Sequence, residues 1–385
     1  MPFEKRTVMN QKKEFVELAL QSAISFSELC RRFNISRRTG YKWLDRYEQL
    51  GDQGLFELSR RPKDQPGRIS SEIEKQIIVL RQDNPEWGAK KIYRLLQNGV
   101  FDGVYPFTKV PARSTINRVL NRNGLIKKEK SEQSKSYIRF EHDKPNDLWQ
   151  MDFKGYFVML NKRVCHPLTI TDDHSRYNIT LAACTNQTYV TVKKELEKVF
   201  NKYGLPKKIL TDNGSPWGTT GSYTSEGFRS YTKLEKWLMI LNVNVIHGRP
   251  FHPQTQGKEE RFHRTLKTEL LKYELFNNIK NSQLKFDCWR SKYNHYRPHE
   301  AIDFDVPDKR YTPSERSYNE KLCTVEYNRS DIKRKVTQGG TINYKGKKYR
   351  VGKAFVGEYV ALRPTMKDGI LSVYFCNTNI RNITL

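Results

Sequence analysis

The sequence lacks any uninterrupted apolar run long enough to cross a membrane, and its N-terminal segment MPFEKRTVMNQKKEF lacks the apolar centre of a secretory signal. Its cysteines are scattered, and none forms a Cys-x-x-Cys pair. That spacing argues against a disulfide framework and against a zinc knuckle. We therefore expect no membrane partner and a reducing, cytoplasmic location.

Acidic residues are also scarce relative to basic ones. The 385 residues contain 69 Lys+Arg against 42 Asp+Glu, a formal net charge of +27. A surplus of this size gives information about binding partners and not about the fold. It favours a partner rich in phosphates, because basic side chains that neutralise phosphates gain affinity by releasing counterions. Because the charge is spread over the whole chain, a polyanionic partner is favoured over a basic but inert surface. The length predicts two to four domains.

Residues 1–57 have the pattern of a helix-turn-helix. An apolar stripe in the first helix is followed by FSELCRRFNISRRTGYKWLDRY, in which Asn34-Ile35-Ser36 is a short turn. The helix that starts near Ser36 should direct Tyr41 and Leu44 inward. Its outward side chains at the start are basic and suit the major groove of DNA, although a plain helical hairpin is the alternative. The expected DNA-binding residues here are Arg37, Arg38 and Lys42.

A proline-rich basic linker at 58–69 precedes a second helical region at 70–127. The stretch PARSTINRVLNRNG should bury Ile116, Val119 and Leu120, and expose Arg113 and Arg118 as DNA-binding residues. We interpret this region as a second helix-turn-helix, with a dimerisation module as the alternative. A polar linker at 128–146 follows.

Strands and helices mix over residues 147–305, which predicts one α/β domain. LWQMDFKGYFV alternates as a strand does, CHPLTITDDHSRYNITLAACT reads as a hairpin, and YVTVKKELEKVFNKYG is an amphipathic helix. A connector at 306–332 leads to a tail at 333–385 with β-rich runs separated by glycine turns. We expect this tail to be a small, basic, five-stranded β-barrel that binds DNA.

Three segments carry carboxylates placed for chemistry. Asp152 lies on the polar side of the first strand. Asp212 ends a strand at LTDNG, and the carboxyl ends of strands are where α/β sheets bind ligands, although Asp-Asn-Gly is also ordinary turn chemistry.

The helix start HPQTQGKEERFHRTLK offers two adjacent acids, Glu259 and Glu260. At 100° per residue, Glu259 shares its azimuth with the apolar side that should pack. Glu260 lies on the side of Arg264 and Lys267, two cations suited to holding phosphate. Glu260 is therefore the candidate for chemistry, and Glu259 for a helix-start acid.

The motifs LWQMDF, LTDNGSPW, HPQTQGKEERFHRTL and YNHYRPHEAI…TPSER resemble those of bacterial insertion-sequence transposases with a retroviral-integrase-type core. The resemblance covers nearly the whole chain. It implies a multidomain protein: all-α helix-turn-helix units, a central α/β ribonuclease-H-like core and a β-rich tail. It also implies a catalytic triad of Asp152, Asp212 and Glu260, the Glu standing three residues after Gly257. The zinc domain of retroviral integrases is replaced here by helix-turn-helix units.

The resemblance implies that the triad holds two Mg²⁺ or Mn²⁺ ions, which agrees with the hard oxygen donors. The expected activity is cleavage at the ends of an insertion sequence to free 3′-OH groups, followed by their joining to target DNA. Both the terminal inverted repeats and the target would be double-stranded DNA, in the bacterial nucleoid. Two element ends require at least two active sites, so we expect a homodimer or a larger assembly.

Several alternatives stay open from the residues alone. A nuclease of the same fold with no joining step, or a non-enzymatic DNA-binding descendant of a transposase, would share most of these patterns. Asp172 and Asp173 in TDDHSRY should turn a hairpin, with metal binding as the alternative. Arg249 and His252 could touch DNA or fix a loop, and Trp217 could stack on a base or plug a core.

Overall fold

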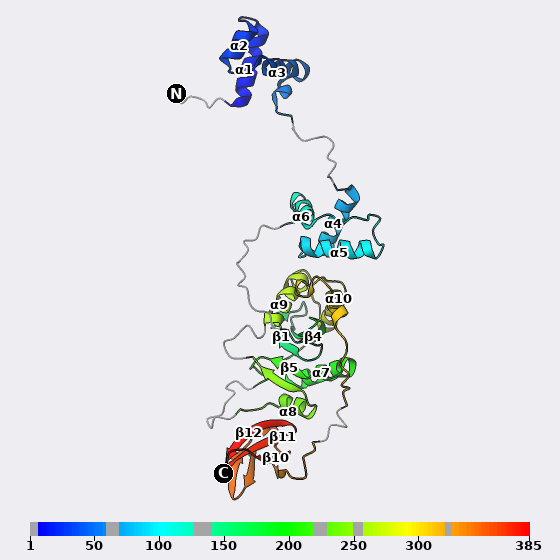
Figure 1. Cartoon of the computed structure of the whole chain (residues 1–385), viewed down its shortest axis with the longest axis vertical. Helices are drawn as coiled ribbons and strands as arrows, with labels where there is room; N and C mark the ends of the chain where they lie inside the picture. Colours follow the sequence, from blue (N-terminus) through cyan, green and yellow to red (C-terminus); the bar gives the residue numbers. More distant parts are fainter. Residues whose placement is uncertain (1–6, 59–68, 127–140, 219–228, 249–256, 320–324) are drawn as a thin grey trace. The chain divides into compact units, whose positions relative to one another are not determined.

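The computed structural model describes residues 7–58, 69–126, 141–218, 229–248, 257–319 and 325–385, which are coloured in Figure 1. The chain divides into two units, Met1–Arg68 and Ile69–Leu385. Within the described ranges, no helix combines the length and hydropathy that a membrane span requires.

The first unit is a three-helix fold. Its helices are α1 (Val8–Gln21), α2 (Phe26–Arg32) and α3 (Arg37–Leu50), with a 3₁₀ turn after them. The helix α3 starts next to Ser36 as predicted, and the Ser36 hydroxyl caps it by accepting a hydrogen bond from the Thr39 N–H at 3.1 Å. The expectation that Tyr41 faces inward was wrong: Tyr41 is 57% exposed and stacks on Phe26. Trp43 is the buried aromatic of α3.

The second unit begins with another three-helix bundle: α4 (Ser71–Asp83), α5 (Ala89–Phe101) and α6 (Arg113–Arg122). As predicted, Ile116, Val119 and Leu120 are buried in its core. Arg113 and Arg118 are exposed on α6.

A mixed sheet forms the centre of the second unit. Its strands are β1 (Trp149–Phe153), β2 (Phe157–Val158), β3 (Val164–Asp172), β4 (Asn178–Cys184), β5 (Lys208–Thr211) and β6 (Asn244–His247). β3 pairs antiparallel with β1, β2 and β4, whereas β5 runs parallel to both β1 and β6. β3 and β4 form the predicted hairpin around the turn that follows Asp172.

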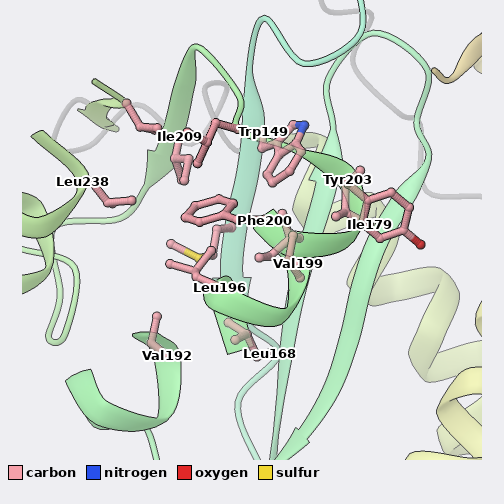
Figure 2. Packing of buried hydrophobic residues seen from close by; sticks show 14 of the residues in the cluster. Trp149, Leu168, Ile179, Val192, Leu196, Val199, Phe200, Tyr203, Ile209 and Leu238 are labelled. Atoms are coloured by element: carbon pink, nitrogen blue, oxygen red, sulfur yellow. The ribbon is translucent and has the colours of Figure 1, made fainter. Parts of the chain in front are cut away.

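Helices cover both faces of this sheet. The helices are α7 (Tyr189–Tyr203), α8 (Lys233–Ile240), α9 (Gly257–Leu266) with a π turn at Lys267–Leu271, and α10 (Ile279–His295). Along β3, Leu168 and Ile170 join the cluster under α7 and α8, while Cys165 joins the cluster under α9 and α10. Figure 2 shows Phe200 of α7 at the centre of the first cluster, beside Trp149 and Ile209. The alternation in the strand sequences thus becomes a three-layer α/β/α core.

The motif YNHYRPHEAI…TPSER forms a brace of hydrogen bonds on the core's backbone. Asn294 accepts from the Asn178 N–H at 2.8 Å and donates to the Asn178 carbonyl at 3.0 Å. Arg316 donates to the carbonyls of Pro206, Leu241 and Asn242 at 2.8 to 3.0 Å. These contacts satisfy backbone groups at the start of β4 and in two loops, so these residues of the motif support the structure of the core.

The C-terminal part, residues 325–385, is a small β domain. Its strands are β7 (Ile332–Lys335), β8 (Thr341–Tyr344), β9 (Lys347–Arg350), β10 (Tyr359–Pro364), β11 (Ile370–Phe375) and β12 (Thr378–Thr384). They form a four-stranded antiparallel sheet, β12-β11-β10-β7, and a separate β8-β9 hairpin. Within residues 325–385 this arrangement replaces the expected five-stranded closed barrel, because the hairpin pairs with itself. Met239 of α8 packs into the domain's apolar cluster.

Replacement of Phe200 by Ala should lower the free energy of unfolding by about 3–5 kcal/mol, because it leaves a cavity between α7 and the sheet. Chemical denaturation followed by tryptophan fluorescence measures this change. The matched control is Lys198→Ala on the solvent side of the same helix, where the side chain is 60% exposed. An equal effect of the two substitutions would contradict the assigned packing.

Candidate active site

The parallel pairing of β1 and β5 brings Asp152 and Asp212 together. Trp149 pairs with Ile209 and Gln150 with Leu210. Continued by two residues, this register sets Asp152 opposite Asp212. Neighbouring strands lie roughly 5 Å apart, and residues that share a register project to the same face. Two carboxylates therefore meet at one edge of the sheet.

Asp152 lies in a partly buried position on the face of the sheet covered by α9. Burial, followed by the negative charges of Asp212 and Glu260, raises the pKa of Asp152 to about 6. A hydrogen bond of 2.7 Å from the Phe153 N–H opposes this shift. The three predicted triad residues are therefore close enough for the charges of two of them to disfavour ionisation of the third.

Asp212 follows β5 directly and sits in a turn held from both sides. Its Oδ1 accepts from the Gly214 N–H at 2.9 Å, so the turn chemistry foreseen for Asp-Asn-Gly is present. The His247 ring at the end of β6 lies 2.7 Å from the Asp212 carbonyl oxygen and 3.0 Å from the Glu235 carboxylate. The Glu235 side chain is buried and also pairs with Arg229. These contacts fix the backbone that carries Asp212.

The first turn of α9 separates its two glutamates as the helical azimuth predicts. Glu259 is 2% exposed, whereas Glu260 points to solvent together with Arg264 and Lys267. Only Glu260 is therefore free to meet a ligand.

Glu259 is buried between α9 and β3, among polar side chains. Its Oε2 accepts from the Thr169 hydroxyl at 3.0 Å, and the same hydroxyl lies 2.8 Å from Nε2 of His263. Burial raises the pKa of Glu259 to about 8, and the nearby charge of Asp152 adds to this shift. Burial lowers the pKa of His263 to about 3. Near neutral pH both groups are uncharged, which limits the negative charge beside Asp152.

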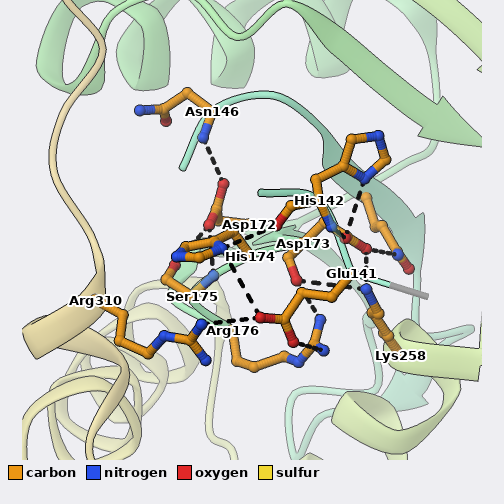
Figure 3. Close-up of polar contacts among 11 residues, drawn as sticks. Glu141, His142, Asn146, Asp172, Asp173, His174, Ser175, Arg176, Lys258 and Arg310 are labelled. Atoms are coloured by element: carbon orange, nitrogen blue, oxygen red, sulfur yellow. Dashed lines mark hydrogen bonds and ion pairs between the residues drawn. The ribbon is translucent and has the colours of Figure 1, made fainter. Parts of the chain in front are cut away.

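Asp172 and Asp173 serve the hairpin turn and its surroundings (Figure 3). Asp172 accepts from the backbone N–H of Asn146 and of Ser175, both at 2.8 Å. Asp173 accepts from the His142 N–H at 2.9 Å and forms an ion pair with Lys258 of α9. Burial raises the pKa of Asp173, but the hydrogen bond and charge of Lys258 outweigh it and leave the pKa below its usual value. Burial and the Arg176 charge also lower the pKa of Lys258.

The donor chemistry of the triad fits a divalent ion better than any other group. Carboxylate oxygens are hard ligands, and a cation would offset the mutual repulsion that raises the pKa of Asp152. Among the residues that the structure describes, however, no three His, Cys, Asp or Glu side chains converge closely enough to hold one ion.

The remaining predicted site residues have mixed outcomes. Arg37, Arg38 and Lys42 are exposed on α3, which belongs to a different unit from Asp152, Asp212 and Glu260. Arg249 and His252 lie outside the described residues. Of the two readings of Trp217, the core plug is the one observed. It is 2% exposed and its ring centroid lies 5.3 Å from that of Phe153.

No pattern in the sequence had indicated a role for His247, Glu235 or His263, or the ion pair between Lys258 and Asp173. Their contacts join segments far apart in the chain, which no local pattern reveals. A polar residue at an apolar helix position, as for Glu259 and His263, was the one available signal.

Known domains match most of the chain. Residues 142–253 and 241–307 each match an Integrase core domain. Residues 11–63 match a Helix-turn-helix domain and residues 39–120 a Homeodomain-like domain. Residues 331–385 match the IS481 family transposase, C-terminal domain.

Relatives with known names point in the same direction. The chain is 26% identical over 410 residues to the transposase for transposon Tn552 of Staphylococcus aureus, spanning 94% of this chain and 80% of the relative. It is 21% identical over 249 residues to an uncharacterized 31.7 kDa protein of insertion element IS407 from Burkholderia multivorans, spanning 63% of this chain and 82% of the relative. Among solved structures, the HTLV-2 integrase catalytic core domain in complex with magnesium is 15% identical, with 44% of this chain covered, 99% of that chain covered and a TM-score of 0.33.

The fold is that of an integrase core domain, and helix-turn-helix domains precede it in the chain. These matches and the relatives support membership of the integrase/transposase superfamily of bacterial insertion sequences. Its homology supports DNA transposition or integration by that core.

Replacement of Glu259 by Gln should remove a pH dependence of stability. Because the pKa of Glu259 rises from 4.5 to about 8 on folding, the contribution of Glu259 to stability is greatest below pH 4.5 and declines as the pH rises to about 8. Over the whole titration this contribution amounts to roughly 5 kcal/mol at most. The difference in unfolding free energy between wild type and Glu259→Gln, measured from pH 4.5 to 8, isolates this contribution, since the opposite slope from His263 is common to both. A pH-independent difference would contradict the buried, protonated state.

Proposed function

We propose that this chain is a DNA transposase that binds the ends of an insertion sequence, cleaves to free 3′-OH groups and joins them to target DNA. The observation that carries the proposal is the register of β1 and β5, which sets Asp152 opposite Asp212 with Glu260 close enough to raise the Asp152 pKa. A single carboxylate could simply stabilise a turn. Three carboxylates whose charges repel one another are explained by a role as cation ligands, because a bound cation offsets the repulsion.

In this proposal Asp152, Asp212 and Glu260 are the catalytic residues and hold two Mg²⁺ or Mn²⁺ ions. When bound, such ions supply activation of a water or a 3′-OH and stabilisation of the leaving oxygen. The chain itself contributes position: β1 and β5 fix the two aspartates, and α9 presents the glutamate. His247 restrains the Asp212 backbone, and neutral Glu259 keeps further negative charge away from the phosphate. The in-line displacement needs no covalent bond between protein and DNA.

Several basic residues are proposed to hold DNA outside the reacting centre. Arg264 and Lys267 point to solvent on the same side of the helix as Glu260, which suits contacts to the phosphates of the element end. The helix-turn-helix units would recognise the terminal inverted repeats through α3 and α6, with Arg37, Arg38, Lys42, Arg113 and Arg118. Arg249 is proposed for the same role from its place in the sequence.

The assembly follows from the substrate. Because an element has two ends, joining both requires at least two active sites, and we propose a homodimer or larger oligomer on DNA. The place of action would be the bacterial nucleoid in the cytoplasm, where element and target DNA lie.

A nuclease of the same fold remains the rival, and the joining step distinguishes the two. Pre-cut ends bearing the inverted repeats that flank the gene, a target plasmid and Mg²⁺ form the test. Joined products support the transposase, whereas hydrolysis of the target without joining supports the nuclease.

Asp152→Asn, Asp212→Asn and Glu260→Gln should each reduce cleavage and joining by more than about 100-fold, since even partners outside the first ligand shell of a metal contribute 10–100-fold. DNA binding, measured by gel shift, should stay within about twofold of wild type. Asp287→Asn, a 52% exposed carboxylate on α10, is the matched control. Full joining by Glu260→Gln would overturn the assignment of the third carboxylate.

Arg264→Ala and Lys267→Ala should each weaken DNA binding at 100 mM salt and reduce the slope of log K against log salt by about 1, because each removes one phosphate contact. Fluorescence anisotropy over a salt series measures both quantities. Lys198→Ala on α7 also removes an exposed cation and should leave the slope unchanged. An unchanged slope for both α9 variants would exclude them from the DNA interface.

A further inference from the structure

The carboxylate of Asp173 connects the two elements that carry opposite ends of the proposed triad. On one side its Oδ1 accepts a hydrogen bond of 2.7 Å from Nε2 of Gln150 in β1. On the other side the same oxygen pairs with the ammonium group of Lys258 in α9. Gln150 stands two residues before Asp152, and Lys258 stands two residues before Glu260.

This connection is buried and geometrically constrained. Asp173 is 2% exposed and Gln150 is 3% exposed. A second contact of 3.4 Å joins the Lys258 ammonium to the Asp173 carbonyl oxygen, so the lysine is held at two acceptors of one residue. The His142 N–H and ring occupy Oδ2, at 2.9 and 3.2 Å, which fixes the carboxylate in its plane. A charged pair in such a setting is sensitive to the loss of either member.

The pair also completes a two-point attachment of the first turn of α9. Lys258 is held at Asp173, just beyond the end of β3, and Glu259 is held at Thr169, four residues earlier on the same strand. Two adjacent helical residues attached at separate points along β3 fix both the rotation and the tilt of that turn. The direction of the next residue, Glu260, is then determined by 100° of helical rotation.

We propose that Asp173 and Lys258 are positioning residues, whose ion pair holds Glu260 of α9 in place relative to Asp152 of β1. This inference rests on the proposed function, because it assumes that Glu260 is a metal ligand. It gives Asp173 a role that is distinct from metal binding: its carboxylate orients the helix that carries Glu260, through the ion pair with Lys258. The local stretch TDDHSRY does not reveal this role.

The test measures metal binding by the full-length chain without DNA. Isothermal titration with Mn²⁺ should show that Lys258→Met weakens affinity by roughly 10–100-fold, as expected when the support of a ligand is lost. Asp173→Asn should do the same, and the double variant should be no worse than either single variant, because all three break one contact. Arg261→Met, which removes an exposed cation from the same turn, is the matched control and should bind Mn²⁺ as wild type does.

A purely structural role predicts a different pattern. It would lower the unfolding midpoint of the variants while the folded fraction kept wild-type affinity for Mn²⁺. Positioning predicts weaker Mn²⁺ binding at temperatures where the variants are fully folded, and joining that recovers in part at high Mn²⁺ concentration. Wild-type affinity in Lys258→Met and Asp173→Asn, or failure of both to fold, would overturn the proposal.

Glu260→Gln in the same titration separates this inference from the proposed function. Wild-type Mn²⁺ affinity in Glu260→Gln would show that the ligand assignment itself fails. Weak binding by Glu260→Gln combined with wild-type binding by Lys258→Met and Asp173→Asn would reject the positioning role alone.

Discussion

The parallel pairing of β1 with β5 is the constraint on which the account of this protein depends. It makes two acids from distant parts of the chain neighbours, since Asp152 and Asp212 share the register of Trp149 and Ile209. The apolar cluster around Phe200 holds that pairing from the α7 side. The site therefore takes its geometry from strands in the middle of the packed sheet, which suits a reaction that relies on position and charge.

On the face of the sheet covered by α9, the contacts limit the negative charge that lies near Asp152. An acid inserted between α9 and β3 would add to the repulsion among the triad, yet burial keeps Glu259 protonated near neutral pH. The nearby His263 is kept neutral by burial as well. Basic groups are placed where they do not compete for the site: Lys258 is paired with Asp173, while Arg264 and Lys267 face solvent. The arrangement leaves one site of concentrated negative charge in a strongly basic chain.

Local signals explain what the sequence could predict. The helix start near Ser36, the apolar spacing in α6 and the azimuth that separates Glu259 from Glu260 all depend on residues within one helix. Errors arose where a choice depended on a neighbouring element. Tyr41 faces solvent because Trp43 takes the inward position against the other helices, and the tail pairs as a sheet and a separate hairpin.

The contacts that support the proposed site could not be predicted in the same way. His247 reaches Glu235 and the Asp212 backbone across three segments, and Asp173 reaches Lys258 across 85 positions of sequence. Such pairs depend on the tertiary fold, and a single sequence carries no trace of them. The motif YNHYRPHEAI…TPSER is the opposite case: it is easy to see in the sequence, but its role is not. It accompanies the carboxylate motifs, yet its side chains brace the backbone of the core.

The central claim is that Asp152, Asp212 and Glu260 form one site for two divalent ions. Electron paramagnetic resonance of the chain titrated with Mn²⁺, in the presence of a duplex bearing the inverted repeat that flanks the gene, tests it most directly. Two Mn²⁺ ions per chain with mutual spin coupling are expected, and this coupling should be lost in Glu260→Gln. A single isolated ion, or coupling that survives Glu260→Gln, would contradict it.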